Sequence, residues 1–173
     1  MKRIALLLPL LLLIVGCGTT ATITYPTPTA STASSTAHGR CMAARGLPDA
    51  HCTPGAIFPG VSAQKLCVSG YTRTVRNVSA SEKAQVYTEY GVIAHQPGQF
   101  EIDHLIPLEL GGSNDISNLW PESATPVPGF HQKDQLENYL HDKVCSGAIS
   151  LKDAQHEIAT NWIGAYDAMR SSH

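Results

Sequence analysis

A folded domain can begin only near Gly39, because the first 38 residues comprise two segments that offer no core. Residues 1–16 are a short leader that is basic and then apolar, and residues 17–38 are an uncharged stretch rich in Thr, Ser, Ala and Pro. Such a stretch is typical of a spacer. We therefore expect a single domain, residues 39–173. A chain of 173 residues leaves no room for a TIM barrel or a two-domain dinucleotide enzyme.

The leader ends in a cysteine that directly follows its apolar run. Ile4–Val15 is too short for an ordinary transmembrane helix and suits a signal segment. Ile14-Val15-Gly16-Cys17 resembles the bacterial lipobox, which implies cleavage before Cys17 and a lipid on its sulfur. The alternative is a secretory signal with an incidental cysteine. We expect an exported protein anchored to the membrane of the bacterial cell envelope, and Gly18 favours the outer membrane where two membranes exist.

Four further cysteines indicate two disulfides. Cys41, Cys52, Cys67 and Cys145 form an even set in a chain expected to be exported. Three pairings are possible. We favour Cys41–Cys52, which closes a short local loop, together with Cys67–Cys145, which closes a long one. Because no two of these cysteines are spaced as Cys-x-x-Cys, we do not expect a four-cysteine zinc site.

Hydrophobic spacing and turn residues predict elements of both kinds, which indicates the α+β class. Leu136, Leu140 and Val144 recur every four residues, as on one face of a helix. Residues 111–115 form a strong turn signal, and residues 39–70 read as loops held by disulfide. The expected helices cover residues 82–90, 131–145 and 151–169, and the expected extended segments cover residues 71–78, 99–110 and 118–120.

The sharpest pattern lies between residues 101 and 131. Its members, in chain order, are Asp103-His104, Pro107, Gly111-Gly112, Asn118-Leu119 and His131. This pattern resembles the His-Asn-His (HNH) endonucleases, and looser likeness to a small exported bacterial subfamily extends over about residues 52–165. The resemblance implies a ββα-metal core, with additional helices and a disulfide-containing loop region before it.

His104 and Asn118 are the expected catalytic pair. A neutral imidazole accepts a proton from water near physiological pH, so His104 has the chemistry of a general base. The resemblance assigns Asn118 the support of the loop that carries this base. An amide suits that role because it donates and accepts hydrogen bonds at once.

Asp103 and His131 are the expected ligands of one divalent metal ion. The resemblance implies this pair, and a carboxylate suits a hard cation. The 13-residue step from Asn118 to His131 is unusual for the family, and Asp134 and Asn138 are alternative ligands. We expect Mg²⁺, with Mn²⁺ or Zn²⁺ as alternatives.

Contacts with nucleic acid require a local basic patch. Without residues 1–16 the chain keeps 10 basic and 14 acidic side chains, a net charge of −4. Arg73 and Arg76, with Lys65 and Lys83 nearby, form the one local basic cluster, and Lys133 lies next to the expected metal ligand. The alternative for the cluster is a solvated surface. We expect Arg73, Arg76 and Lys133 to contact the phosphate backbone.

The sequence therefore predicts a metal-dependent endonuclease that hydrolyses nucleic acid outside the cytoplasm. We expect DNA rather than RNA as the substrate, with low sequence specificity, and no protein partner is implied. The alternative is a non-catalytic binding or structural lipoprotein of the envelope that retains the HNH fold. A toxin-like effector is a third alternative. The lipobox counts against it, because a protein anchored to the membrane cannot reach another cell.

Overall fold

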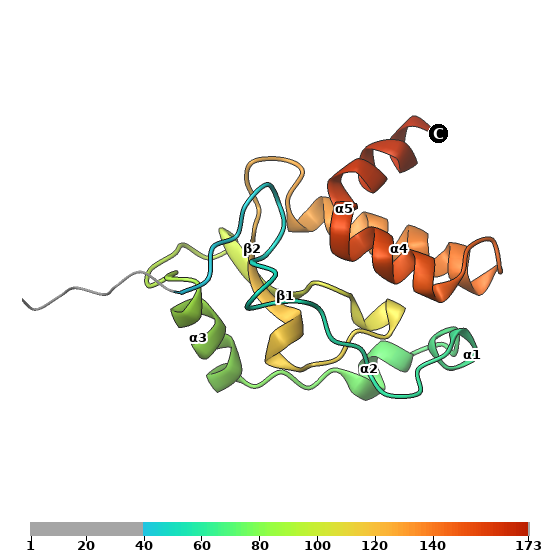
Figure 1. The fold of residues 1–173 in the computed structure, drawn as a ribbon, viewed down its shortest axis with the longest axis horizontal. Helices are drawn as coiled ribbons and strands as arrows, with labels where there is room; N and C mark the ends of the chain where they lie inside the picture. Colours follow the sequence, from blue (N-terminus) through green and yellow to red (C-terminus); the bar gives the residue numbers. More distant parts are fainter. Residues whose placement is uncertain (1–39, 173) are drawn as a thin grey trace, which may run out of the picture. The chain divides into compact units, whose positions relative to one another are not determined.

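The computed structural model describes residues 40–172, which form helices and one small sheet (Figure 1). The expected leader and the whole expected spacer, with the lipidation site Cys17, lie outside the described residues. A mixed α+β class is confirmed. In chain order the elements are α1 (Ala63–Leu66), α2 (Tyr71–Val75), α3 (Ala80–Glu89), β1 (Phe100–His104), the 3₁₀ turns η1 (Leu108–Leu110) and η2 (Ile116–Asn118), β2 (Leu119–Ser123), α4 (Phe130–Cys145) and α5 (Leu151–Ser171).

The sheet consists of β1 and β2, paired antiparallel. Asp103 lies opposite Trp120, and His104 lies opposite Leu119. β1 ends at His104 rather than at residue 110, because the chain turns at Pro107 into η1. β2 continues through Pro121, which a two-stranded sheet tolerates because its outer edge needs no ladder hydrogen bond.

α4 and α5 lie side by side and supply most of the apolar core (Figure 1). Leu136 and Leu140 of α4 pack with Ile158 and Trp162 of α5 in one buried cluster. Leu110, from η1, is fully buried in the same cluster. This core holds the loop after β1 against the helix pair.

Two disulfides are present, one within the loop region before α1 and one between the end of α1 and the end of α4, and both expected pairings are confirmed. Cys41 is bonded to Cys52, and Cys67, directly after α1, is bonded to Cys145 at the end of α4. The second bond closes 78 residues of chain, so it ties the start of the domain to its C-terminal helix pair.

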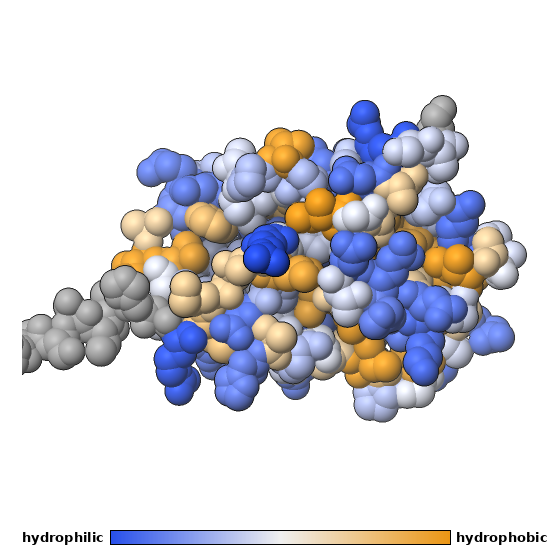
Figure 2. Space-filling view, turned by 45° about the horizontal axis from the view of Figure 1, so that its top comes forward, coloured by the Kyte–Doolittle hydropathy of each residue, from blue (hydrophilic) through white to orange (hydrophobic). Residues whose placement is uncertain are grey.

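The surface mixes hydrophilic and hydrophobic side chains. Figure 2 shows hydrophilic residues over much of the visible face, with smaller hydrophobic areas between them. Within residues 40–172, no helix combines the length and the apolar character that crossing a membrane requires.

Candidate active site

Asn118 fixes the loop that follows β1. It is fully buried at the end of η2, directly before β2 rather than within the strand. Its Oδ1 accepts from the Ile106 backbone N–H at 3.0 Å, and its Nδ2 donates to the carbonyls of Ile106 and Ser113, each at 2.9 Å. A Cβ on Gly112 would collide with the Ile106 carbonyl, so only glycine fits this turn. The side-chain amide of Asn118 therefore holds the loop after β1 in place.

His104, the last residue of β1, is 3% exposed. Its Nε2 lies 3.3 Å from Oδ1 of Asn114. The Asn114 amide is itself oriented, since its Nδ2 donates to the Val75 carbonyl at 2.7 Å and its Oδ1 accepts from the Asn77 backbone N–H at 3.2 Å. Nε2 of His104 therefore carries the proton, and Nδ1 is the nitrogen that can accept one.

The environment of His104 keeps its imidazole neutral. Burial lowers its pKa, and this effect outweighs the opposing attraction of Asp103 and the hydrogen bond that His104 donates to Asn114. Asn114 is the functional residue that the sequence reasoning missed. Its place in the Gly111–Asp115 turn marks it only as a turn residue, because its partners Val75 and Asn77 are distant in sequence.

Lys133 lies at the centre of a buried group of carboxylates, which corrects its expected role. Its side chain has no exposed surface, so it is not placed to contact phosphate. Its Nζ lies 2.6 Å from Asp103 Oδ2, 2.5 Å from Glu137 Oε1 and 3.8 Å from Glu122 Oε2. It also donates to the His104 carbonyl at 2.8 Å. Lys133 therefore joins the first turns of α4 to β1 and β2.

One cation among three carboxylates requires that some of the acids keep their protons. Burial raises the pKa of Glu122 to about 10 and that of Glu137 to about 8. Burial acts in the same direction on Asp103, but Lys133 outweighs it and lowers the pKa of that carboxyl. Near pH 7 the group therefore holds a Lys133–Asp103 ion pair and a neutral Glu122.

His131 does not join Asp103. It is exposed at the start of α4, and its ring lies 4.2 Å from that of Phe130, measured between ring centroids. Residues two apart on a helix face different directions, so the inward position of Lys133 turns His131 away from β1. No described contact joins His131 to Asp103, but its charge acts on Asp134, so its part in holding a metal ion stays a prediction.

Asp134 is an acid of α4 whose pKa responds to the charge of Asp103. Burial raises its pKa, and repulsion from Asp103 adds to this shift. Glu101 on β1 behaves alike, with a pKa raised to about 7 by burial and then by repulsion from Asp103 and Asp134. Repulsion among these three acids marks a region of negative potential beside the ion pair.

Arg76 and Arg73 differ in their relation to the site. Arg76 follows α2, is exposed, and its charge acts on His104 and Asp134. Arg73 is also exposed, but no described contact or pKa shift connects it to His104. Of the three expected phosphate contacts, the structure therefore leaves Arg76 beside the candidate base.

A second group of possible metal ligands lies between α1 and α4. The ligand atoms of Cys67, His141 and Cys145 all lie within 4.8 Å of one another, and no other group of three such ligands meets this limit within residues 40–172. Both cysteines are bonded to each other in the disulfide.

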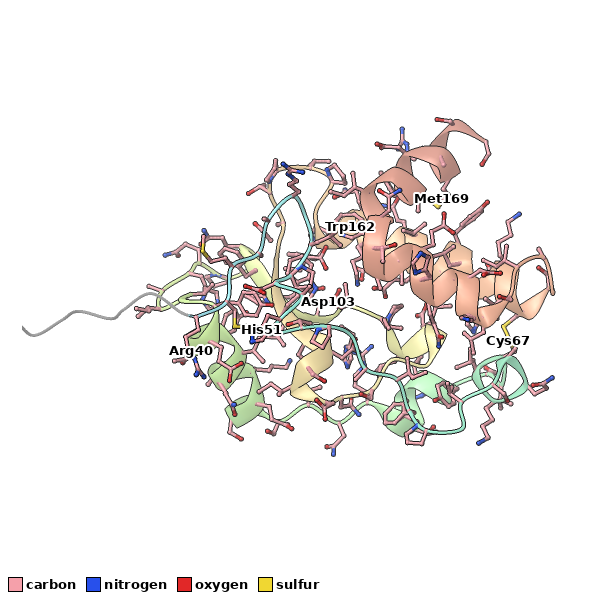
Figure 3. All side chains as sticks on the ribbon, viewed as in Figure 1. Arg40, His51, Cys67, Asp103, Trp162 and Met169 are labelled. Atoms are coloured by element: carbon pink, nitrogen blue, oxygen red, sulfur yellow. A yellow bond between two sulfur atoms is a disulfide. The ribbon has the colours of Figure 1, made fainter. Side chains whose placement is uncertain are left out.

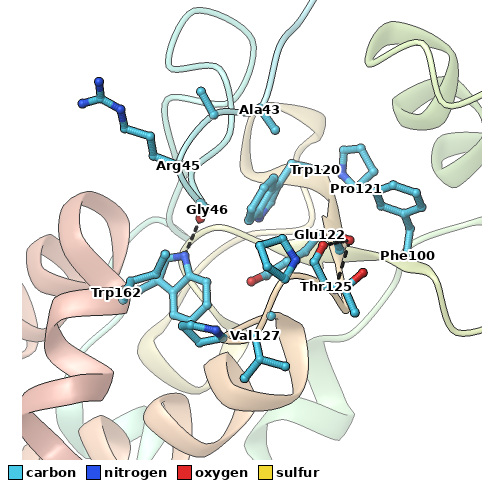
Figure 4. A pocket seen from close by; sticks show the side chains of 16 residues that line it. Ala43, Arg45, Gly46, Phe100, Trp120, Pro121, Glu122, Thr125, Val127 and Trp162 are labelled. Atoms are coloured by element: carbon cyan, nitrogen blue, oxygen red, sulfur yellow. Dashed lines mark hydrogen bonds between the residues drawn. The ribbon is translucent and has the colours of Figure 1, made fainter.

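A pocket of about 630 Å³ opens on the side of the sheet that carries Trp120 and Glu122 (Figure 4). Trp162 forms another wall, and its Nε1 donates to the Gly46 carbonyl. Residues 125–129 close one side. Because Glu122 lines the pocket and also faces Lys133, the pocket and the buried charged group share one side chain.

Comparison of this chain with models of protein families, with curated proteins and with solved structures found no match.

Proposed function

We propose that this domain hydrolyses phosphodiester bonds in nucleic acid, with His104 as the general base. The observation that carries the proposal is the buried, neutral imidazole whose Nε2–H is held by Asn114. Nδ1 of His104 takes a proton from the attacking water while the bond from phosphorus to the leaving oxygen breaks. Asn118 keeps the loop in place and does not itself react.

The order of the elements supports an HNH-type core. β1 and β2 are antiparallel, and α4 follows them and contacts β1 through Lys133 and Asp103. The Asp-His pair lies at the end of β1, and Asn118 lies directly before β2. This is the arrangement that the resemblance implies for a ββα-metal enzyme.

Asp103 and a residue of α4, Asp134 or His131, would hold the divalent cation, since the charges of Asp103 and His131 both act on Asp134. Lys133 occupies Asp103 Oδ2, and the repulsion between Asp103 and Asp134 is what a hard cation relieves. Mg²⁺ bound there would stabilise negative charge on the leaving oxygen. Arg76 supplies a second positive charge for the phosphate, since its charge already acts on His104.

A non-catalytic binding protein is the second candidate. The Lys133–Asp103 ion pair favours it, because the ammonium already neutralises the acid expected to hold a metal. The pocket beside Trp120 would then be the binding site. This candidate predicts a folded protein that is indifferent to chelators.

Plasmid nicking tests the proposal directly. The disulfide-intact protein is incubated with plasmid DNA in Mg²⁺ or Mn²⁺, with EDTA as the parallel sample. We expect metal-dependent cleavage, and His104→Ala lowers its rate by about 10²–10⁴-fold. His156→Ala, an exposed histidine on α5, is the matched control and keeps full activity. Cleavage that survives His104→Ala removes this residue from the mechanism, and absence of cleavage by the folded wild type favours the binding protein.

We also propose export and lipid anchoring through Cys17. The two disulfides are consistent with an oxidising compartment. Fractionation of cells that express the full chain tests this: Cys17→Ala moves the protein out of the membrane fraction, and an unchanged distribution contradicts the anchor.

A further inference from the structure

His141 and Cys145 occupy one face of α4 at the spacing of a helical ligand pair. They lie four residues apart, and Cys145 Sγ is 3.4 Å from His141 Nε2. Figure 3 shows the sulfur of Cys67 between α1 and the end of α4. In tetrahedral zinc sites, Zn–S and Zn–N bonds place sulfur and nitrogen about 3.5 Å apart. The helix therefore already holds these two atoms at the separation that zinc requires.

Cys67 supplies the third donor with little movement. Two zinc-bound thiolates lie about 3.8 Å apart, so the sulfurs must separate once their bond is broken. The two Cα atoms are 5.6 Å apart, and both side chains are exposed. Rotation of an exposed Cys67 side chain is enough to open the required space.

The surroundings of His141 suit a ligand. Its Nδ1 lies 4.0 Å from Asp142 Oδ1, and metal-bound histidines commonly direct their other ring N–H at a carboxylate. Its Nε2 also lies 3.4 Å from the Leu66 carbonyl, which can only accept a hydrogen bond, so a metal ion on Nε2 would replace this contact. Metal binding selects the tautomer with the proton on Nδ1, in which the Nε2 lone pair faces Cys145.

We propose that Cys67, His141 and Cys145 form a zinc site when their disulfide is reduced. A dithiol reductant gives two electrons and two protons to the S–S bond and itself becomes a disulfide. Zn²⁺ then displaces one proton from each thiol, so two thiolates and a neutral imidazole surround the ion, and the fourth position is left to water. The charges of the two thiolates balance that of the ion. α1 then stays tied to α4 in both redox states.

Cobalt titration of the full chain tests the site. The protein is reduced with a phosphine, which spares the metal from competing thiols, and Co²⁺ is added. We expect one Co²⁺ to bind with the ultraviolet thiolate-to-cobalt absorption and visible bands of a tetrahedral ion, and Zn²⁺ to displace it. The disulfide-intact chain shows no such bands.

Matched variants assign the ligands. His141→Ala weakens binding more than about tenfold, whereas His156→Ala does not change it. A Cys67→Ser/Cys145→Ser variant keeps Cys41 and Cys52, the second dithiol, which has no such third ligand within the described residues. This variant loses the bands.

Two outcomes overturn the proposal. One is a reduced chain with native far-ultraviolet circular dichroism that gives no cobalt bands. The other is binding that His141→Ala leaves unchanged. If reduction unfolds the chain, Zn²⁺ must restore the native spectrum, and failure to restore it also overturns the proposal.

Discussion

The two sides of α4 bury very different groups. Toward β1 and β2 the helix buries Lys133 among carboxylates, next to His104 and the fully buried Asn118. Toward α5 it buries Leu140 and other apolar side chains. Apolar packing tolerates substitutions of similar volume and depends little on pH. A buried polar group needs all its hydrogen-bond partners, and its contribution to stability changes when it is protonated or deprotonated. The contrast teaches that the stability contributed by one face of the helix should be independent of pH, whereas that contributed by the other should depend on it.

Lys133→Met should cause the largest loss of stability. The variant leaves the Asp103 carboxylate buried without its cation, so we expect the free energy of unfolding to fall by about 3–5 kcal/mol. Urea unfolding at neutral pH measures it. Lys152→Met on the exposed face of α5 is the control and should change little. If Lys133→Met lowers the free energy of unfolding no more than Lys152→Met does, the ion pair does not contribute to stability.

Leu140→Ala tests the apolar face. Leu140 is 2% exposed within the core cluster, and its truncation should cost about 2–5 kcal/mol. Because no titratable group is removed, the loss in urea unfolding should be the same at acid and alkaline pH. A loss that varies strongly with pH would contradict the division between the two faces.

The pH dependence of stability should come from the polar face. Above about pH 4.5 the unfolded chain releases the Glu122 proton, whereas the folded protein keeps it up to a pKa of about 10. The free energy of unfolding therefore falls as the pH rises through this window, by at most about 1.4 kcal/mol per pH unit for each group of this kind. Glu122→Gln should reduce the slope, and Glu137 sustains the remainder up to about pH 8. A free energy of unfolding that rises with pH across this window would contradict the raised pKa of Glu122 and of Glu137.

Asn114 variants give the smallest expected effect and the finest test of the candidate base. Asn114→Ala removes one hydrogen bond to His104 and should lower kcat/KM by up to about tenfold. Asn114→Asp keeps an acceptor for Nε2–H, and its negative charge raises the pKa of His104. The acidic limb of the pH–rate profile should then move to higher pH, and an unmoved limb would leave Asn114 with a purely structural role.

The sequence predicted the elements that carry strong local signals. The helices expected over 131–145 and 151–169 are present as α4 and α5, since regular apolar spacing is a local feature, although α5 is kinked at Asn161, whose backbone is not helical. α3 begins after Ser79, whose side chain forms a capping box with Glu82, two residues before the helix expected over 82–90.

Residues 71–78 show where local signals fail. Their rough alternation of polar and apolar side chains predicts an extended segment, but Tyr71–Val75 is helical. α2 follows Gly70 at φ +83°, and it packs against α1 and η1, contacts that no local pattern reveals. Tertiary packing decides a segment this short.

The site was predictable in its residue types and not in its pairings. His104 and Asn118 stand in a recognisable order along the chain, but the pattern placed Asn118 within the second strand, whereas it lies in η2 directly before β2. Lys133 appeared to be an exposed cation, because the sequence does not show which face of α4 meets β1.

Both tryptophans of the chain, Trp120 and Trp162, line the same pocket. The tryptophan fluorescence of the protein therefore originates entirely at this pocket. A molecule that enters the pocket, or a movement of residues 125–129, will change the tryptophan emission. Ligands can therefore be screened with the unmodified protein and no added label.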